Sequence, residues 1–451
     1  MSIVSTSAPA AVRVAPAPVV AKIASLDQEG RGIARIDGKA VFVEGALPGE
    51  VVAITTQKRK PTFDLARADA VLKANAARVE PRCPHFGVCG GCSQQHFDAA
   101  AQVAAKQRTL EDALWRLGRV RPALLMPPIH GPSWEYRHRA RLSARYVVKK
   151  GGMLIGFHER KSSYVADMTS CSVLPRRISD LLPKLRALIG GLTVRDRLPQ
   201  IELAVGDGEK AAHVLVLRIL DPLAPEDESA LLAFADAHGV QFFLQPGGPG
   251  TAAPLRPNEP ALAYALPEFD LEFPFSPTEF TQVNPAINRV LVRRAIGLID
   301  PRPGERIADF FCGIGNFTLP LARRCGTAVG IEGSASLVDR ATQIAGFNGL
   351  AGKATFQVAN LFAATPESFE ALGPLDKILV DPPREGAIAL VKALPGDGAP
   401  ERIVYVSCNP ATLARDASVL VHDHGYDLAA AGVVNMFPHT SHVESIALFA
   451  R

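Results

Sequence analysis

One cysteine stands where a strand pattern ends and a helix pattern begins. In "RIVYVSCNPATLARD", residues 402–416, a run of apolar and aromatic positions leads to Cys408, and Asn409 and Pro410 then open a helical pattern. The partial positive charge at a helix N-terminus favours a thiolate, whereas a structural cysteine fits better in mid-strand. The position therefore predicts a nucleophile at Cys408.

Glu444, in "FPHTSHVESIALF", is the candidate general base for that thiol. A thiolate helps a methyl transfer when the acceptor is an inert carbon such as C5 of a pyrimidine, because sulfur adding to C6 creates an enolate at C5. The C5 proton must later leave, which requires a base. His439 and His442 are rival bases, although a structural role suits each of them better.

A glycine-rich turn indicates a cofactor pocket. In "ADFFCGIGNFTLPLA", Asp309 ends a strand, Gly313 and Gly315 allow close approach of a ligand, and Glu332 ends the next strand, where it could grip ribose hydroxyls. This set resembles the S-adenosylmethionine pocket of Rossmann-like methyltransferases. A nicotinamide site is the alternative, but the third glycine of its fingerprint is missing.

A further acid follows the fourth strand of this region. Asp381 opens "DPPREG", and two prolines stiffen the loop behind it. The carboxyl ends of parallel strands share one edge, so Asp381 is expected beside the cofactor crevice. The resemblance of the pocket to that of methyltransferases implies that Asp381 faces the acceptor base.

The seven cysteines do not read as a disulfide framework in a chain of this size. Cys83, Cys89 and Cys92 form a tight cluster, and the others stand apart: Cys171, Cys312, Cys325 and Cys408.

The elements that must position these residues alternate between strand and helix from about residue 276. Five apolar strands precede helical or loop patterns, which predicts a parallel, doubly wound α/β sheet over 276–451. The end of the chain predicts two more strands, as an antiparallel hairpin at the sheet's edge. The five strands are "RIADFF", "TAVGIE", "ATFQVA", "DKILVD" and "RIVYVS".

The upstream part of the chain has a different character. Residues 1–21 read as a disordered tail, and 22–75 as a small β-barrel of the oligonucleotide-binding kind, with a hairpin turn at Asp37-Gly38. Residues 98–118 predict a helix that stops at Gly118. The remainder, 76–97 and 125–275, predicts a central α+β domain.

Composition bounds the class of protein. The 451 residues are 47% hydrophobic, which is enough for two or three full cores, and the net charge of +4 permits a nucleic-acid partner without demanding one. No run of 18 apolar residues occurs and the N-terminus lacks a signal-peptide pattern. We therefore expect a cytoplasmic protein that does not enter a membrane.

Five motifs, agreeing in order and spacing, together resemble the RNA uracil-C5 methyltransferase family: "FTQVNPAINRVL", "DFFCGIGNFTLPLA", "VDPPREG", "VSCNPATLARD" and "HVESIALF". The resemblance implies a Rossmann-like methyltransferase domain over 276–451, with Cys408 as the nucleophile and Glu444 as the base. It also implies contacts with S-adenosyl-L-methionine, carried over to Gln282, Phe311, Asn316, Glu332, Asn360 and Asp381.

The accessory parts refine that resemblance. Residues 22–75 look like a TRAM domain, and the helix of 98–124 is implied to pack with the catalytic domain. The spacing C-x5-C-x2-C of Cys83, Cys89 and Cys92, completed by Cys171, is similar to the family's [4Fe-4S] ligands. Four cysteines also suit tetrahedral zinc, which spacing alone favours, and the resemblance reverses that preference.

A chain with both a TRAM domain and an iron–sulfur cluster resembles the bacterial members of the family that act on 23S rRNA. The resemblance thus implies a monomeric enzyme that forms 5-methyluridine in 23S rRNA. Two alternatives remain: the same chemistry on tRNA, and an RNA-binding iron–sulfur redox sensor on an inactive scaffold. The Cys408–Glu444 pair argues against the sensor, which has no use for either residue.

Overall fold

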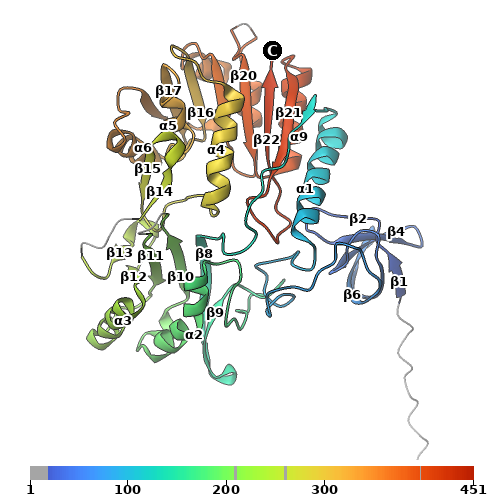
Figure 1. The fold of residues 1–451 in the computed structure, drawn as a ribbon, viewed down its shortest axis with the longest axis vertical. Coiled ribbons are helices and arrows are strands. Elements are labelled where there is room, and N and C mark those ends of the chain that lie inside the picture. The colour runs from blue at the N-terminus through green and yellow to red at the C-terminus, as the bar shows by residue number, and fades with distance from the viewer. Residues whose placement is uncertain (1–18, 208–210, 258–261, 397) are drawn as a thin grey trace, which may run out of the picture. The chain divides into compact units, whose positions relative to one another are not determined.

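The computed structural model describes residues 19–207, 211–257, 262–396 and 398–451, which fall into two compact units, 1–78 and 79–451 (Figure 1). No helix within the described ranges is both long and apolar enough to cross a bilayer.

The first unit is a six-stranded sheet in the order β1-β5-β6-β4-β3-β2. Asp37 and Gly38 both have positive φ, 49° and 79°, and join β3 to β4 in the predicted hairpin. Directly after β1, at one edge, the chain reaches the opposite edge of the sheet, where the Ala24 N–H donates to the Ile33 carbonyl. The sheet therefore curls back on itself. The strands are β1 (Val19–Lys22), β2 (Ser25–Leu26), β3 (Gly32–Ile36), β4 (Lys39–Glu44), β5 (Val51–Arg59) and β6 (Phe63–Lys73).

Strand β1 alters one predicted boundary. Residues 19–21 lie in this strand, where Val19 pairs with Ile54 of β5, rather than in the tail predicted over 1–21. The rest of that predicted tail, residues 1–18, lies outside the described residues.

The second unit contains a mixed six-stranded sheet in the order β13-β12-β11-β10-β8-β9, which lies within the region that the sequence assigned to the central domain. Helices α2 (Arg176–Gly191) and α3 (Pro225–His238) supply buried residues such as Leu182 and Leu231 to its core. The strands are β8 (Arg139–Val147), β9 (Gly152–Gly156), β10 (Gln200–Val205), β11 (His213–Arg218), β12 (Gln241–Gln245) and β13 (Ala253–Pro254).

The same unit contains an eight-stranded sheet in the order β18-β17-β16-β19-β20-β22-β21-β7. The first five strands are parallel, as predicted, and β22 runs antiparallel to both β20 and β21. The strands are β16 (Arg306–Phe310), β17 (Thr327–Glu332), β18 (Ala354–Val358), β19 (Lys377–Val380), β20 (Arg402–Ser407), β21 (Asp427–Val434), β22 (Glu444–Ala450) and β7 (Leu124–Leu125).

The C-terminal hairpin does not lie at the edge of this sheet, contrary to the prediction. Strand β7, only two residues long and distant in sequence, pairs in parallel with β21 and forms the edge. Two more segments from before residue 276 join this part of the molecule. Strands β14 (Leu262–Leu266) and β15 (Leu271–Phe275) place Leu266 and Phe273 in the same core as the sheet.

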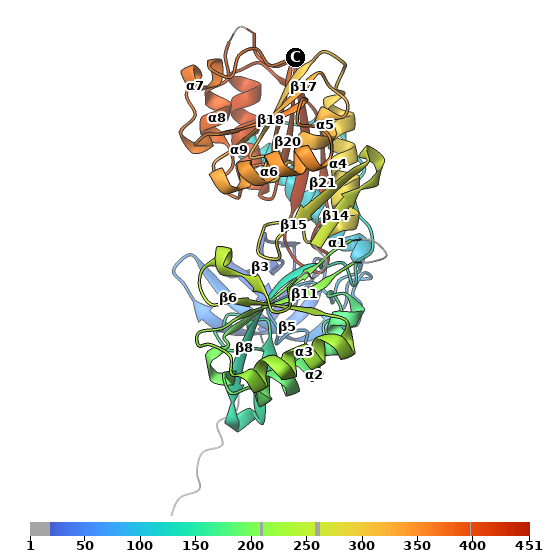
Figure 2. The ribbon, with the colours of Figure 1, turned by 90° about the vertical axis from the view of Figure 1, so that its left-hand side faces the viewer.

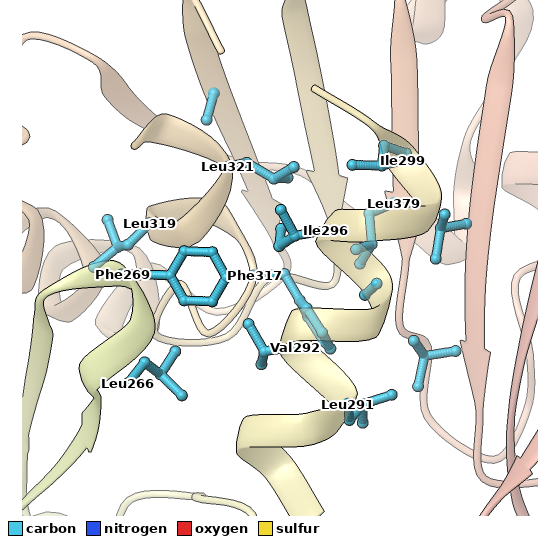
Figure 3. Close-up of a cluster of buried hydrophobic side chains, with 14 of the residues drawn as sticks. Leu266, Phe269, Leu291, Val292, Ile296, Ile299, Phe317, Leu319, Leu321 and Leu379 are labelled. Atoms are coloured by element: carbon cyan, nitrogen blue, oxygen red, sulfur yellow. The ribbon is translucent and has the colours of Figure 1, made fainter. Parts of the chain in front are cut away.

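Helices cover both faces of the eight-stranded sheet (Figure 2). Alternate residues of each strand face opposite sides, so Leu379 and Val404 enter one core while Val380 and Ile403 enter the other. The first core packs against α4 (Pro285–Ile299), α5 (Thr318–Ala322) and α6 (Ala335–Phe347), as Figure 3 shows for α4 and its neighbours. The second packs against α1 (Ala99–Ala113), α8 (Ile388–Lys392) and α9 (Pro410–His422).

Short helical turns complete the chain. A π-helical turn, η1 (Leu114–Gly118), continues α1 to the predicted stop at Gly118. The others are α7 (Pro366–Glu370) and the 3-10 turns η2 (Val148–Lys150), η3 (Arg195–Arg197), η4 (Pro249–Thr251), η5 (Pro267–Phe269) and η6 (Leu361–Ala363).

Gly118 allows η1 to lie directly against α9, because a Cβ there would collide with the carbonyl oxygen of Ala414. We expect Gly118→Ala to lower the free energy of unfolding by about 1–3 kcal/mol, the usual range for overpacking. The measurement is denaturant unfolding followed by circular dichroism. Gly297→Ala is the matched control: it lies in α4 with open space around it and should stabilise by about 0.5–1 kcal/mol. Equal effects from the two substitutions would contradict the close approach.

Candidate functional site

The predicted catalytic pair meets at one edge of the eight-stranded sheet. Cys408 directly follows β20, whereas Glu444 is the first residue of β22, which runs the opposite way. Ser407 pairs with Ser445 across the two strands, and the Ser445 hydroxyl donates to the Ser407 carbonyl at 3.3 Å. The register therefore places Cys408 and Glu444 side by side, each half-buried.

The thiol of Cys408 lies just before helix α9. Asn409 caps the helix by accepting from the Ala411 N–H at 3.0 Å. Burial, with Glu444 and Asp381 nearby, raises the pKa of Cys408 to about 11, and only the Arg384 guanidinium and a backbone hydrogen bond oppose the shift. The expected preference for a thiolate is thus not found, because burial and two acids outweigh the helix end.

Glu444 is held in a region that disfavours its charge. Burial and the neighbouring Asp381 raise its pKa to about 8, while the cations of Lys106 and Arg384 lower it. Burial also raises the pKa of Asp381 to about 7. A carboxyl group with a pKa near neutral pH is well matched to general acid–base work.

The loop after Asp381 is fastened to the start of α9. The Arg384 carbonyl accepts from the Asn409 side chain at 3.1 Å. The buried Asp416 carboxylate accepts from the Ala387 N–H at 2.7 Å and from the Tyr405 hydroxyl at 2.6 Å. These bonds tie the Asp381 loop to the same helix that Cys408 precedes.

A second loop, residues 435–443, leads into Glu444 and turns at His439, which has a positive φ of 63°. His439 is 3% exposed and stacks on Trp134 with ring centroids 3.8 Å apart. Burial lowers its pKa to about 4, so the ring is neutral. His442 is exposed and its Nδ1 lies 3.1 Å from the Arg384 guanidinium. Of the three candidate bases, Glu444 is the one next to the thiol.

The glycine-rich turn lies at the same edge of the sheet, after β16. Gly313 and Gly315 have positive φ, and so does Phe311, at 64°, which is rare for an aromatic residue. The Gly313 N–H donates to one Glu332 oxygen at 3.2 Å and the Ser334 N–H to the other at 3.1 Å. Glu332 therefore faces the turn, as predicted.

Three acids, Asp309, Glu332 and Asp381, lie near this turn and form no salt bridge within the described part of the chain. Asp309 is fully buried; one oxygen accepts from the Thr318 hydroxyl at 2.6 Å and the other has no hydrogen bond in the described part of the chain. Burial, then Asp381 and Glu332, raise the pKa of Asp309 to about 8. The region can therefore accept a positively charged ligand.

The remaining predicted contacts form two groups. Asn316 exchanges hydrogen bonds of 3.0 Å with Asn288, and Gln282 lines a small cavity with that same Asn288. On the other side, Asn360 caps η6, and the Phe362 ring there lies 5.5 Å from the ring of Phe311.

Sequence reasoning missed several residues of this region. Tyr264 donates to Asn316 at 3.1 Å from outside the predicted catalytic domain, and Lys106 approaches Glu444 from α1. The sequence did contain a signal for Asn288. It lies one helical turn after the helix cap Asn284, and residues at that spacing are neighbours on a helix.

The four cysteines of the predicted cluster line one cavity, which Met168 and Phe157 also border. Burial raises the pKa of Cys92 to about 12 and that of Cys171 to about 11. Within the described ranges, no three His, Cys, Asp or Glu side chains converge closely enough to hold one metal ion. The four residues are Cys83, Cys89, Cys92 and Cys171.

Comparison with family models finds two matches. A model described as "TRAM domain" matches residues 19–71. A model described as "tRNA (Uracil-5-)-methyltransferase" matches residues 368–451, which include Cys408 and Glu444.

Comparison with known proteins finds relatives along nearly the whole chain. A protein of Aromatoleum aromaticum named 23S rRNA (uracil(1939)-C(5))-methyltransferase RlmD is 64% identical over 96% of this chain and 99% of its own length. A protein of the same name from Nitrosospira multiformis is 60% identical over 96% and 98%. Among solved structures, Pyrococcus abyssi tRNA (uracil-54, C5)-methyltransferase, in complex with S-adenosyl-L-homocysteine, has a TM-score of 0.74 at 22% identity. It covers 96% of this chain and 100% of its own, which shows a shared fold.

The raised pKa of Cys408 predicts slow alkylation at neutral pH, because only the thiolate reacts. The rate with iodoacetamide, followed by mass spectrometry of the Cys408 peptide, should rise about tenfold per pH unit between pH 7 and 9. At pH 9, Glu444→Gln should speed the reaction by removing a negative neighbour, and Arg384→Ala should slow it. A rate that does not change over this pH range would contradict the assignment.

Proposed function

This chain belongs to the family of 23S rRNA (uracil-C5)-methyltransferases, and we propose that it methylates C5 of one uridine in 23S rRNA with S-adenosyl-L-methionine as the methyl donor. The observation that carries the proposal is the Cys408–Glu444 pair beside the Ser407–Ser445 pairing. The relatives' names specify uracil 1939, and we propose the same uridine here.

The residues at the glycine-rich turn fit this donor. Each Glu332 oxygen accepts one backbone N–H and keeps a free lone pair for a ribose hydroxyl. Asp309 is fully buried and Asp381 half-buried, and both have raised pKa values, so a cationic ligand is favoured near them. Bound S-adenosyl-L-methionine would supply the methyl group and that positive charge. Gln282, Phe311, Asn316 and Asn360 are the further contacts that we propose.

The chain's own residues carry the remaining chemistry. The Cys408 thiol first loses its proton to solvent. The thiolate then adds to C6 of the uracil, and the C5=C6 electron pair moves into an enolate on the C4 oxygen. After C5 has gained its methyl group, Glu444 removes the C5 proton. The C5–H electron pair re-forms the C5=C6 bond, the C6–S bond breaks, and the sulfur leaves as the Cys408 thiolate. Atoms and charge balance over the cycle.

Two features of the chain suit an RNA substrate. The target uridine must leave its stack to reach a thiol at the edge of a sheet, which costs a few kcal/mol that RNA contacts elsewhere must offset. The TRAM domain carries exposed Lys58, Arg59 and Lys60, and we propose that they contact phosphates. We also propose that the enzyme works in the cytoplasm, where ribosomal RNA is made, and that it is a monomer.

The choice of rRNA over tRNA rests on the relatives. The matched C-terminal family model is named for tRNA, but it covers only the catalytic end of the chain. The relatives that match over nearly the whole length, accessory parts included, are named for 23S rRNA.

We propose that the four cysteines hold a structural [4Fe-4S] cluster. A zinc ion needs four sulfurs about 2.3 Å from one point, and the described residues contain no such single-ion arrangement. A four-iron cluster takes one thiolate per iron and keeps its ligands further apart, which suits four thiols around one cavity. When bound, the cluster would cross-link the segment of Cys83–Cys92 to Cys171.

The function is tested with unmodified 23S rRNA fragments and labelled methyl donor. We expect methyl transfer to a fragment containing uracil 1939, none after its change to cytosine, and none to unmodified tRNA. Cys408→Ala should reduce transfer below detection, and Glu444→Gln should trap RNA covalently on the protein because the adduct cannot lose its proton. Transfer to tRNA alone would overturn the substrate assignment, and freely dissociating RNA from the glutamine variant would overturn the role of Glu444.

The cluster is tested on protein purified without oxygen. Iron and acid-labile sulfide should each approach about four per chain, with the broad visible absorption of a cluster. Cys171→Ser should lose both, while the matched variant Cys325→Ser, a buried cysteine outside the cavity, should retain them. Zinc without iron in the parent protein would show that the proposal is wrong.

A further inference from the structure

The π-helical turn η1, which continues α1, exposes bulky side chains that the fold does not bury. Leu114 and Gly118 at its two ends are buried. Between them, Trp115 is 45% exposed and Leu117 is 58% exposed. An exposed apolar area of this size commonly marks an interaction site, and π-helical turns are frequent at functional sites.

Arginines surround the exposed tryptophan. The Arg121 guanidinium lies 3.9 Å from the centroid of the Trp115 ring, and Arg121 is itself exposed, so the ring face that it covers is turned to the surface. Arg119, directly after η1, is exposed with a positive φ of 55°. Neither of these two arginines forms a salt bridge within the described ranges. The residues that we call the η1 surface are Trp115, Arg116, Leu117, Arg119 and Arg121.

The charge of this stretch suits an anionic partner. Residues 108–125 contain four arginines and two acids, a net charge of +2, whereas the whole chain of 451 residues has +4. Arginines beside an exposed aromatic ring are typical of sites for unpaired nucleic acid, because guanidinium groups contact phosphates and any base can stack on the ring. An acidic protein would also match the charge, but the position of the η1 surface favours RNA.

The η1 surface lies close to the sheet edge where Cys408 and Glu444 meet. Helix α1 and its continuation η1 pack beside α9 (Figure 1), with Gly118 directly against the Ala414 carbonyl. Ala414 is about 6 Å along the helix axis from Pro410, the first residue of α9. A stacked strand advances about 3.4 Å per nucleotide, so an RNA with its target uridine at Cys408 reaches η1 within a few nucleotides.

We propose that the η1 surface binds 23S rRNA beside the target uridine, with its arginines on phosphates and an unpaired base stacked on Trp115. Arg121 moves from the indole ring to a phosphate when the base takes its place. The inference rests on the proposed function and adds an RNA contact from outside the 276–451 catalytic region. These contacts supply part of the energy that offsets flipping of the uridine.

The stacking contact is tested by measuring the affinity for a 23S rRNA fragment in which single nucleotides flanking the target are made abasic. One abasic position should weaken binding to the parent protein about tenfold, the usual order for a lost stacking contact. Trp115→Ala should bind the intact fragment about as weakly and lose no more at that position. Trp115→Phe keeps a flat ring and should behave like the parent. Phe347→Ala, which removes an exposed ring at the far end of α6, is the matched control and should bind normally.

The phosphate contacts are tested by the salt dependence of the same binding. Arg119→Asn removes the charge but keeps a residue that tolerates a positive φ. It should reduce the slope of log affinity against log salt by about 0.7, the value for one phosphate on a single strand. Arg302→Ala is the matched control, because this exposed arginine precedes β16, at the edge of the sheet opposite to Cys408. It should leave the slope unchanged.

Parent-like binding by Trp115→Ala, or abasic sensitivity that this variant retains at every position, would overturn the proposal and leave the η1 surface to an acidic protein. Circular dichroism checks that the variants fold. Should Trp115→Ala not fold, an unchanged salt slope in Arg119→Asn would overturn the proposal equally. Failure of the proposed function looks different, because the parent itself would then neither methylate the 23S rRNA fragment nor prefer it to tRNA.

Discussion

The site depends on one strand pairing, that of β20 with β22. The strand before Cys408 and the strand that Glu444 begins run in opposite directions, so a residue that follows one lies beside a residue that starts the other. In a parallel pair the carboxyl ends of both strands share one edge, whereas the antiparallel β22 brings the start of a strand to that edge. Strand β22 therefore brings Glu444 to the edge where Asp381 and Glu332 lie. Backbone hydrogen bonds to β20 hold it there.

Electrostatics then decide the resting state of that edge. Burial raises the pKa values of Asp309, Asp381 and Glu444 toward neutrality. Burial, with Glu444 and Asp381 nearby, also raises the pKa of the Cys408 thiol. Lys106 and Arg384 oppose this rise for Glu444, because their positive charges favour its carboxylate. A cationic ligand would change this balance, because a positive charge stabilises the ionised forms of these groups.

The loop of residues 435–443 receives bonds from several distant parts of the chain. The N–H groups of Ser93 and Gln94 both donate to the His439 carbonyl, at 2.9 and 3.0 Å, directly after Cys92. The Gln102 side chain accepts from the His439 N–H at 2.8 Å, and the Tyr136 hydroxyl donates to the Pro438 carbonyl at 3.0 Å. The segment that follows Cys92 thus helps to hold the turn that precedes Glu444.

Local patterns in the sequence were sufficient for the elements and for the types of residue that do chemistry. The strand runs 327–332 and 402–407, the hairpin turn at Asp37-Gly38 and the placement of Cys408 between a strand and a helix all follow from short-range rules of periodicity, turn geometry and capping. Tertiary structure alone decided which elements became neighbours: β7 as the edge of the catalytic sheet, β22 next to β20, and Lys106 beside Glu444. It also decided the protonation of Cys408, because a pKa depends on burial and on charges from distant segments, and neither is encoded in the residues that flank the thiol.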